Sequence, residues 1–378
     1  MNRTKVLEVI RQGQIGGGES HLSDLIELMD KTDYEPVCLS FTNGEMINRL
    51  QEMEIKCYVV ETTKPFNLSI LQRIIQIIKD ENITIVHAHG TRAASNVLFP
   101  CLRLGLPLIY TVHGWSFHDD QKKVVYTLRK WSEKFICNFA TRVICVSEGN
   151  AETGRKSFSF TNAVVIKNGI NLHRFNLDRK SSLYKTDFEF SETDFIVGFV
   201  ARCTKQKAPM DFLEATKRAH QIDNRVKGLF VGEGDMDADV DRFIADNHME
   251  KYLFRSRFRT DIPDILPLMD VYCLPSLWEG LSIGLLEAMA TGCSIVATPT
   301  DGTQEIIHHE HNGLIVPFNS PEAISSAIVR LLDDEPLRIK CQRNAADLIV
   351  KRFNAQNTAD AVVDIYRNIF YKSPRVYE

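Results

Sequence analysis

Short apolar runs alternate with stretches of helical periodicity along this chain, and this alternation constrains the fold more than any other feature. Strands that alternate with helices form βαβ units and parallel sheets. The predicted strands lie at residues 6–10, 36–41, 56–60, 83–90, 107–114, 142–148, 164–170, 195–201, 227–234, 271–276, 294–300 and 313–317. The sequence therefore predicts an α/β protein whose apolar strands form sheets covered by helices on both faces.

A polar stretch divides the strands into two series, which predicts two domains joined by a linker. The chain has 378 residues, a length that suits two domains of ordinary size. Each domain is expected to be Rossmann-like, with a doubly wound parallel sheet. The predicted bounds are an N-terminal domain at 1–176, a linker at 177–193, a C-terminal domain at 194–355 and a C-terminal helix at 356–378.

The composition argues against several classes of protein. A net charge of −4 argues against a nucleic-acid partner, since such proteins carry a basic excess. The N-terminus lacks the apolar run of a signal peptide, and no stretch approaches the ~20 apolar residues that span a bilayer. The nine cysteines are odd in number and include no C-x-x-C pair, which indicates buried thiols in a reducing compartment. We therefore expect a cytoplasmic protein.

Histidines stand at the ends of two predicted strands. Ligands bind doubly wound sheets beyond the carboxyl ends of the strands, where His87, His89 and His113 fall. The spacing of His87 and His89 places them on one strand face. A metal site would need a third ligand, and none is evident nearby, so no metal site is predicted.

Two acids flank the start of a predicted helix in the segment 274–305. Glu279 precedes the helix and Glu287 lies inside it. The free N–H groups of a helix N-terminus are a seat for a phosphate, from which Glu287 can reach a ribose and Glu279 a sugar beyond the phosphates. The alternative is that both acids only interact with the helix dipole.

Two cations follow a predicted strand in the second domain. Arg202 and Lys207 can clamp a diphosphate and neutralise the charge that grows on a leaving group. The alternative is a pair of solvated loop cations. Because these two residues supply positive charge, we expect a reaction that needs no metal ion. The Asp-x-Asp matches within 235–239 are attributed to chance, as first-turn acids of a helix.

A glycine-rich loop at Ile15–Glu19 follows the first predicted strand. Glycines allow a backbone to approach a phosphate closely. A dinucleotide-binding G-x-G-x-x-G loop that starts at Gly16 would need glycine where His21 stands, so binding of a nicotinamide cofactor is poorly supported.

The chain resembles the retaining family-4 glycosyltransferases of the GT-B fold. The resemblance lies in Glu279-x7-Glu287, the following AMATG, the VAT strand and the acid in DGTQE. It departs from the family pattern at Ala208, Ser282 and Asp301, and the last of these puts the donor preference in doubt.

The resemblance implies two domains that face a cleft, with the last helix crossing back to the first domain. It implies that Glu279 contacts the donor sugar, that His113 lies beside that sugar, and that His89 and Trp115 line the acceptor cleft. The residues that would bind the donor diphosphate and ribose are Gly17, Gly18, Arg202, Lys207, Gly280, Leu281, Ser282 and Glu287.

The implied reaction moves a hexose or N-acetylhexosamine from a nucleotide-diphospho-sugar to a glycan or lipid-linked acceptor, with retention of configuration. Capsule or lipopolysaccharide synthesis is the expected pathway, and UDP or GDP can carry the sugar. A nucleotide-sugar epimerase and a catalytically inactive sugar-binding protein are the alternatives. The intact Arg202, Lys207, Glu279 and Glu287 argue against the inactive protein.

A basic, aromatic helix is predicted at 122–134. Such a helix can dock on the anionic inner face of a plasma membrane, which would make the protein a peripheral membrane protein. The alternative is a solvated helix that packs its Val, Tyr and Leu side chains inward.

Overall fold

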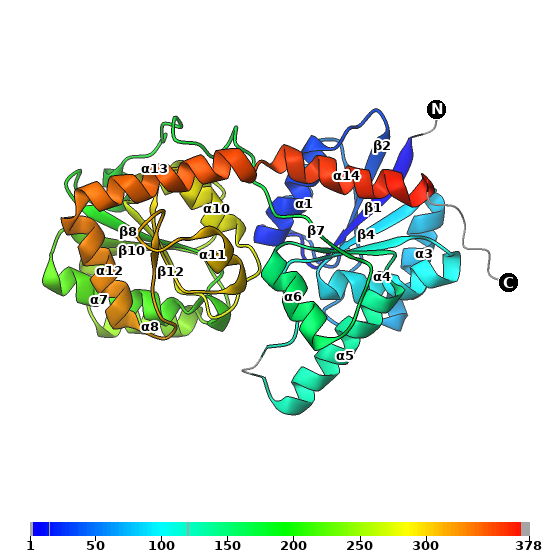
Figure 1. Ribbon diagram of the computed structural model, residues 1–378, viewed down its shortest axis with the longest axis horizontal. Helices are drawn as coiled ribbons and strands as arrows, with labels where there is room; N and C mark the ends of the chain where they lie inside the picture. Colours follow the sequence, from blue (N-terminus) through cyan, green and yellow to red (C-terminus); the bar gives the residue numbers. More distant parts are fainter. Residues whose placement is uncertain (1–2, 15, 119–120, 372–378) are drawn as a thin grey trace. The chain divides into compact units, whose positions relative to one another are not determined.

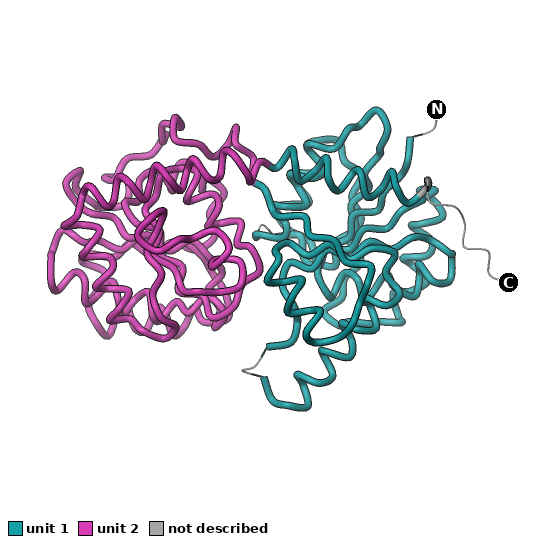
Figure 2. Tube along the Cα trace, viewed as in Figure 1, with its two compact units in different colours: residues 1–169, 355–378 teal, residues 170–354 magenta. Residues whose placement is uncertain are grey.

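The computed structural model describes residues 3–14, 16–118 and 121–371. These form two compact units (Figure 2). Unit 1 comprises residues 1–169 and 355–378, and unit 2 comprises residues 170–354. The predicted contribution of Ile15 to the glycine loop and the end of the predicted C-terminal helix, 372–378, lie outside the described residues.

Within the described residues, unit 1 contains a parallel sheet of seven strands in the order β3-β2-β1-β4-β5-β6-β7. The strands are β1 (Thr4–Ile10), β2 (Tyr34–Ser40), β3 (Lys56–Val59), β4 (Ile85–His89), β5 (Leu108–Val112), β6 (Arg142–Cys145) and β7 (Ala163–Val165). The strand order reverses between β1 and β4, and doubly wound sheets bind ligands at such a switch point.

Helices cover both faces of the unit 1 sheet, because alternate residues of each buried strand are apolar. In β1, Val6 packs in one cluster and Leu7 and Val9 pack in another. The helices on the Val6 side are α1 (Gly17–Leu28), α2 (Glu45–Glu52) and α14 (Ala355–Tyr371). The helices on the Leu7 side are α3 (Leu71–Asp80), α4 (Thr91–Leu104), α5 (Lys123–Phe139) and α6 (Glu148–Ser157).

The C-terminal helix α14 returns to the first unit, which confirms the predicted crossing back. It lies beside α1 (Figure 1). Ala359, Val362 and Tyr366 of α14 are buried in one cluster with Val6 and Leu25. The last helix is therefore part of the core of unit 1.

Unit 2, which the structure describes throughout 170–354, contains a parallel sheet of six strands in the order β10-β9-β8-β11-β12-β13. The strands are β8 (Phe195–Val200), β9 (Val226–Val231), β10 (Leu253–Ser256), β11 (Val271–Leu274), β12 (Ser294–Ala297) and β13 (Leu314–Ile315). The helices are α7 (Pro209–Ile222), α8 (Asp237–Asp246), α9 (Ile262–Ile265), α10 (Ile283–Ala290), α11 (Asp301–Ile306), α12 (Pro321–Asp333) and α13 (Glu335–Arg352). The switch point lies between β8 and β11, the strands that precede the predicted donor-binding loops.

The segment predicted as a linker, 177–193, belongs to unit 2. Phe188 and Phe190 in this segment are buried, and Arg179 forms an ion pair with Asp264 at 2.9 Å. The polar composition of the segment concealed these anchors. Among the described residues, no helix is both long enough and apolar enough to cross a membrane.

Candidate active site

Lys207 and Glu279 come from separate sequence motifs, and the fold of unit 2 brings them into contact. Lys207 ends the short 3₁₀ helix η3 (Lys205–Lys207) after β8, and Glu279 lies in the loop after β11. The ammonium group of Lys207 contacts Glu279 Oε1, and the two side chains are only 13% and 10% exposed. Ser276 Oγ donates a hydrogen bond to the same carboxylate oxygen at 3.0 Å. A cation and an anion are thus fixed together at the switch point.

Backbone hydrogen bonds hold these two loops in place. The Leu277 N–H donates to the Gln206 carbonyl oxygen at 2.8 Å. The Gln206 side-chain amide donates to the Trp278 carbonyl oxygen, also at 2.8 Å. Because Gln206 precedes Lys207 and Trp278 precedes Glu279, these two hydrogen bonds hold the backbone next to the ion pair in place.

Helix α10 begins beside this pair. Its N-cap is Ser282, whose hydroxyl makes no capping hydrogen bond, so the first-turn N–H groups can receive a phosphate. Leu281, the residue before this N-cap, is buried, at 4% exposure. A Cβ on Gly302 would stand 1.8 Å from the Gly280 carbonyl oxygen, so the chain at the start of α10 is pressed against α11.

Glu287 lies on α10 near the same site. Burial raises the pKa of Tyr272 well above its usual range, and the negative charges of Glu287 and Glu279 add to this effect. The Tyr272 hydroxyl donates a hydrogen bond to the Val200 carbonyl oxygen at 3.0 Å. Glu279 lies in the loop before α10 and Glu287 lies in the second turn of this helix, as the sequence pattern predicted.

Arg202 follows β8 and is exposed. Within the described parts of the chain, its guanidinium forms no hydrogen bond or ion pair with another side chain. Its exposure leaves the guanidinium accessible to an anionic ligand.

The predicted Asp-x-Asp match is engaged in structural ion pairs. Asp237 pairs with Arg255 and with Arg257, both at 2.6 Å. These pairs join the start of α8 to β10 and the residue after it.

In unit 1, a carboxylate is buried at the centre of a network of polar side chains. Glu8 lies in β1, and its side chain is fully buried. It accepts a hydrogen bond from the Tyr366 hydroxyl at 2.7 Å, and its Oε2 lies 2.9 Å from His89 Nε2 and 3.2 Å from His87 Nδ1. Burial opposes ionisation of Glu8, but the adjacent His87 and His89 outweigh that cost and hold its pKa well below the usual range.

Both ring nitrogens of His87 have partners. Nδ1 lies 2.5 Å from the Tyr366 hydroxyl, and Nε2 lies 2.7 Å from Thr111 Oγ1. Of the two histidines on β4, His87 is held within the core by these contacts, whereas the ring of His89 also contacts His113.

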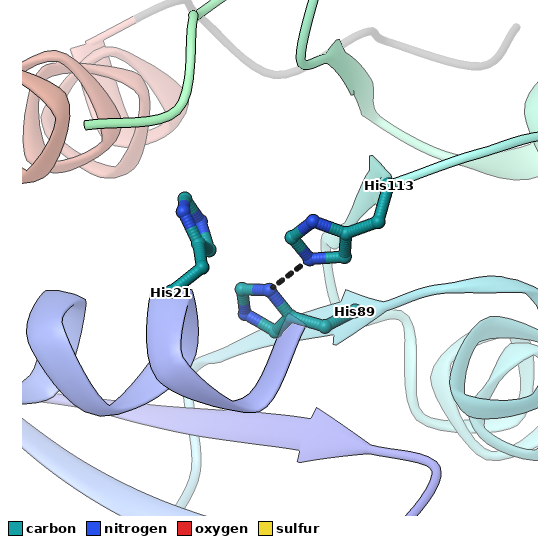
Figure 3. A group of neighbouring side chains, drawn as sticks. All are labelled: His21, His89 and His113. Atoms are coloured by element: carbon teal, nitrogen blue, oxygen red, sulfur yellow. Dashed lines mark hydrogen bonds between the residues drawn. The ribbon is translucent and has the colours of Figure 1, made fainter. Parts of the chain in front are cut away.

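Three imidazoles meet beyond the carboxyl ends of β4 and β5 (Figure 3). His89 Nδ1 lies 3.4 Å from His113 Nε2, and their rings are stacked. The His21 ring, from the first turns of α1, lies 5.0 Å from the His113 ring centroid. Burial lowers the pKa of His21 to about 3 and that of His89 to about 4, and it places the pKa of His113 well below its usual range. All three are therefore neutral at pH 7.

The prediction that no third metal ligand lies near His87 and His89 is wrong. His21 and His113 each bring a ring nitrogen within 4.8 Å of the His89 ligand atom, and Glu8 completes a second group with His87 and His89. The sequence analysis missed Glu8, His21 and Tyr366. An acid inside an apolar strand was the available signal for Glu8, and a position in the helix directly after the glycine loop was the signal for His21.

The glycine loop lies next to His113. Gly17 and Gly18 are the first residues of α1, and a Cβ on Gly18 would be 3.5 Å from His113 Cδ2. The structure thus places Gly18 next to the predicted catalytic histidine.

Trp115 lies in the core of unit 1. Its side chain is 5% exposed, stacks on Phe117 and contacts Phe158 edge-on. Its indole N–H donates to the Asn150 carbonyl oxygen at 2.7 Å. The ring is thus used in packing, and the acceptor role of Trp115 stays a prediction.

Two family profiles together match most of the chain. "Glycosyltransferase Family 4" matches residues 15–174, and "Glycosyl transferases group 1" matches residues 182–348. A galactosyltransferase of Escherichia coli that acts on α-D-GlcNAc-diphosphoundecaprenol is 30% identical over 331 residues, which are 82% of this chain and 85% of that protein. The chain belongs to the family-4, group 1 glycosyltransferases. It is accordingly a retaining glycosyltransferase, and the epimerase and inactive-protein alternatives are not favoured.

Other relatives agree with this assignment. An N-acetylgalactosaminyltransferase of Campylobacter jejuni, named for N,N'-diacetylbacillosaminyl-diphospho-undecaprenol, is 26% identical over 84% of this chain and 87% of its own length. The crystal structure of HepE from Anabaena with UDP-glucose has a TM-score of 0.84 at 19% identity, over 97% of this chain and 100% of that chain. That likeness shows the GT-B fold.

Proposed function

We propose that this glycosyltransferase moves a hexose or N-acetylhexosamine from a UDP-sugar to a lipid-linked glycan, in the synthesis of a bacterial surface polysaccharide. The observation that carries the proposal is the contact of Lys207 with Glu279 at the start of α10. The names of the two curated relatives support the acceptor class, since both specify diphosphoundecaprenol-linked sugars. The names of the first relative and of the HepE complex support UDP as the carrier.

In this proposal, the donor diphosphate lies at the N-terminus of α10. The N–H groups of Gly280, Leu281 and Ser282 and the charges of Arg202 and Lys207 stabilise the departing diphosphate. Because these groups supply the positive charge, the diphosphate needs no divalent ion.

The acids bind the two sugars of the donor. Glu287 accepts hydrogen bonds from the ribose hydroxyls, and Glu279 accepts one from the transferred sugar. The bond from C1 to phosphate breaks as the acceptor hydroxyl reaches the same face, through an oxocarbenium-like state. The departing phosphate oxygen takes the acceptor proton. The configuration at C1 is retained because the new bond forms on the face from which the diphosphate departs.

His113 contacts the transferred sugar, and Gly17 and Gly18 allow the sugar and phosphate to approach. The tautomer follows from the hydrogen bonds. With Glu8 as acceptor, His89 carries its proton on Nε2, and its Nδ1 accepts from His113 Nε2–H. His113 Nδ1 is then the acceptor that faces a sugar hydroxyl, and His89 lines the acceptor side.

We also propose that α5 docks on an anionic membrane, where a lipid-linked acceptor resides. Val124, Leu128 and Trp131 of α5 are 71%, 66% and 64% exposed, so the alternative in which Val and Leu pack inward does not hold for Val124 and Leu128. The Lys134 ammonium lies over the Trp131 ring at 5.3 Å. An exposed apolar stripe beside lysines suits the boundary between lipid tails and anionic head groups.

A groove extends this apolar surface. Its volume is about 500 Å³, and its lining residues are Phe66, Leu68, Phe99, Leu128, Trp131, Ser132 and Phe135.

Among the nine cysteines, all of which are described and free, only Cys57 is partly exposed. Reduced, buried thiols agree with a location on the cytoplasmic side of the membrane.

Thermal-shift measurements with UDP-, GDP- and ADP-sugars test the donor, since a ligand at 100 times its Kd adds about 2.7 kcal/mol of stability. The donor that stabilises the protein is then incubated with polyprenyl-diphosphate-linked N-acetylglucosamine, and products are identified by mass spectrometry. A sugar added to the lipid supports the proposal. An epimerised nucleotide-sugar formed without acceptor, or the absence of both stabilisation and transfer with every UDP-sugar, would overturn it.

A further inference from the structure

We propose that His21, His89 and His113 form a binding site for a divalent transition-metal ion of the zinc class, and that occupation of this site inhibits sugar transfer. The three residues come from α1, from the end of β4 and from the residue after β5 (Figure 3). Their ligand nitrogen atoms all lie within 4.8 Å of one another.

The separation of His89 and His113 matches tetrahedral zinc. Zn–N bonds of about 2.0–2.1 Å at the tetrahedral angle place two ligand nitrogens about 3.3 Å apart. His89 Nδ1 and His113 Nε2 are 3.4 Å apart. Three imidazoles are a ligand set that suits zinc, copper and nickel, and a fourth position stays available for water.

His21 supplies an independent observation. Its Nε2 is buried and has no hydrogen-bond partner among the described residues, and the side chain is only 5% exposed. A buried polar atom without a partner costs free energy, because the water it has lost is not replaced. Coordination of a metal ion would satisfy this nitrogen atom.

Glu8 provides the outer-shell contact that histidine ligands of metals usually make. A ligating histidine donates its other ring N–H to a carboxylate, which fixes the tautomer and raises the basicity of the ligand. His89 Nε2 lies 2.9 Å from Glu8 Oε2, so Nδ1 is the nitrogen that can coordinate. The Tyr366 hydroxyl holds the same carboxylate at 2.7 Å.

The second cluster, formed by Glu8, His87 and His89, is not the better site. Both nitrogens of His87 already lie within hydrogen-bond distance of hydroxyl groups, at 2.5 and 2.7 Å. A metal ion there would have to replace one of these contacts, whereas the buried His21 Nε2 has no such contact among the described residues. The ion is therefore expected at the cluster of His21, His89 and His113.

The inhibitory consequence rests on the proposed function of His113. A metal ion on His113 Nε2 removes the proton that this nitrogen donates to His89 and fixes the ring against movement toward a sugar. In this proposal sugar transfer itself needs no metal ion. An added ion of the zinc class inhibits transfer because it competes with productive binding of the donor sugar.

Zinc binding is measured first, by isothermal titration of ZnCl₂ into the full chain after treatment with EDTA and desalting. The expected stoichiometry is one ion per chain, with a Kd at least about tenfold weaker in His21→Gln, because a three-histidine set loses one ligand. Glu8→Gln is a second variant, expected to weaken binding about 10–100-fold. Visible absorption of tetrahedral Co²⁺ in the wild type, absent in His21→Gln, reports the geometry.

His311→Gln is the matched control, since His308 and His311 form another histidine pair, with ring centroids 6.5 Å apart. If His311→Gln lowers the affinity and His21→Gln does not, the proposal is overturned. The same holds if the folded wild-type chain binds no Zn²⁺ or Co²⁺.

Inhibition is measured next. Zn²⁺ is expected to inhibit transfer by the wild type, with recovery on addition of EDTA. His21→Gln is expected to need at least about tenfold more Zn²⁺ to lose half of its own metal-free rate. A chain that binds zinc at His21 but transfers no sugar contradicts the proposed function alone. A chain that transfers sugar and binds no zinc contradicts this inference alone.

Discussion

Glu279→Ala and Lys207→Ala, made singly and together, test whether the ion pair at the start of α10 acts as one unit in transfer. The Lys207 and Glu279 side chains are in contact and are 13% and 10% exposed. Lys207→Ala removes a charged group from the departing diphosphate, which costs about 2.7–4 kcal/mol, or ~10²–10³-fold in kcat. Glu279→Ala removes a sugar contact and also releases Lys207, so kcat is expected to fall ~10³-fold or more.

Initial rates with UDP-sugar and lipid-linked acceptor give kcat and KM, and thermal unfolding shows that each variant is folded. Because the two residues contact each other, the double variant is expected to be no more than about tenfold slower than Glu279→Ala. A loss equal to the product of the two single losses would refute the reasoning. Lys205→Ala, an exposed position in the same 3₁₀ helix, is the control and should keep nearly the wild-type rate.

Three further predictions follow from packing, exposure and burial. Gly302→Ala places a Cβ 1.8 Å from the Gly280 carbonyl oxygen. It is therefore expected to destabilise unit 2 by about 1–3 kcal/mol and to weaken binding of UDP. Urea unfolding and titration with UDP measure the two effects, and unchanged stability and affinity would contradict the close approach of the two backbones. Leu128→Glu, at a side chain that is 66% exposed, is expected to reduce sedimentation with anionic vesicles at unchanged stability, whereas equal sedimentation would contradict membrane docking by α5. Burial raises the pKa of Glu133, although the hydrogen bonds that its carboxylate accepts lower it. The folded state therefore binds this proton more tightly than the unfolded state does, and the free energy of unfolding falls as the pH rises above 4.5, the ordinary pKa of a glutamate. Glu133→Gln should therefore gain stability relative to the wild type between pH 5 and pH 8 in urea unfolding, and a constant difference would contradict this sign.

The sequence was most informative for unit 2 because the residues that matter are close together along the chain. Glu279, Gly280 and Glu287 all lie in one stretch around the start of α10. The strand and helix pattern also placed Arg202 and Lys207 at a strand end. The contact between Lys207 and Glu279 was not predicted, since it depends on β8 and β11 being adjacent in the sheet.

The unit 1 cluster was less predictable because its members are far apart in sequence. Strand order places β1, β4 and β5 side by side, and this adjacency is not contained in any local pattern. The packing of Trp115 was likewise not predictable, because its partners Phe117 and Phe158 are brought to it by the fold. Its predicted place in the acceptor cleft stays a prediction.

The buried carboxylate of Glu8 explains how the end of the chain contributes to the site. A carboxylate inside an apolar sheet is costly unless its oxygens are hydrogen-bonded. Among the described residues, no lysine or arginine forms an ion pair with Glu8. Its contacts come from His89, His87 and the Tyr366 hydroxyl, which lies on α14, 2.7 Å from Glu8 Oε1. The return of α14 to unit 1 therefore does more than bury apolar surface. It stabilises the ionised Glu8 that fixes the His89 tautomer, and through His89 it sets which nitrogen atom His113 presents to a ligand.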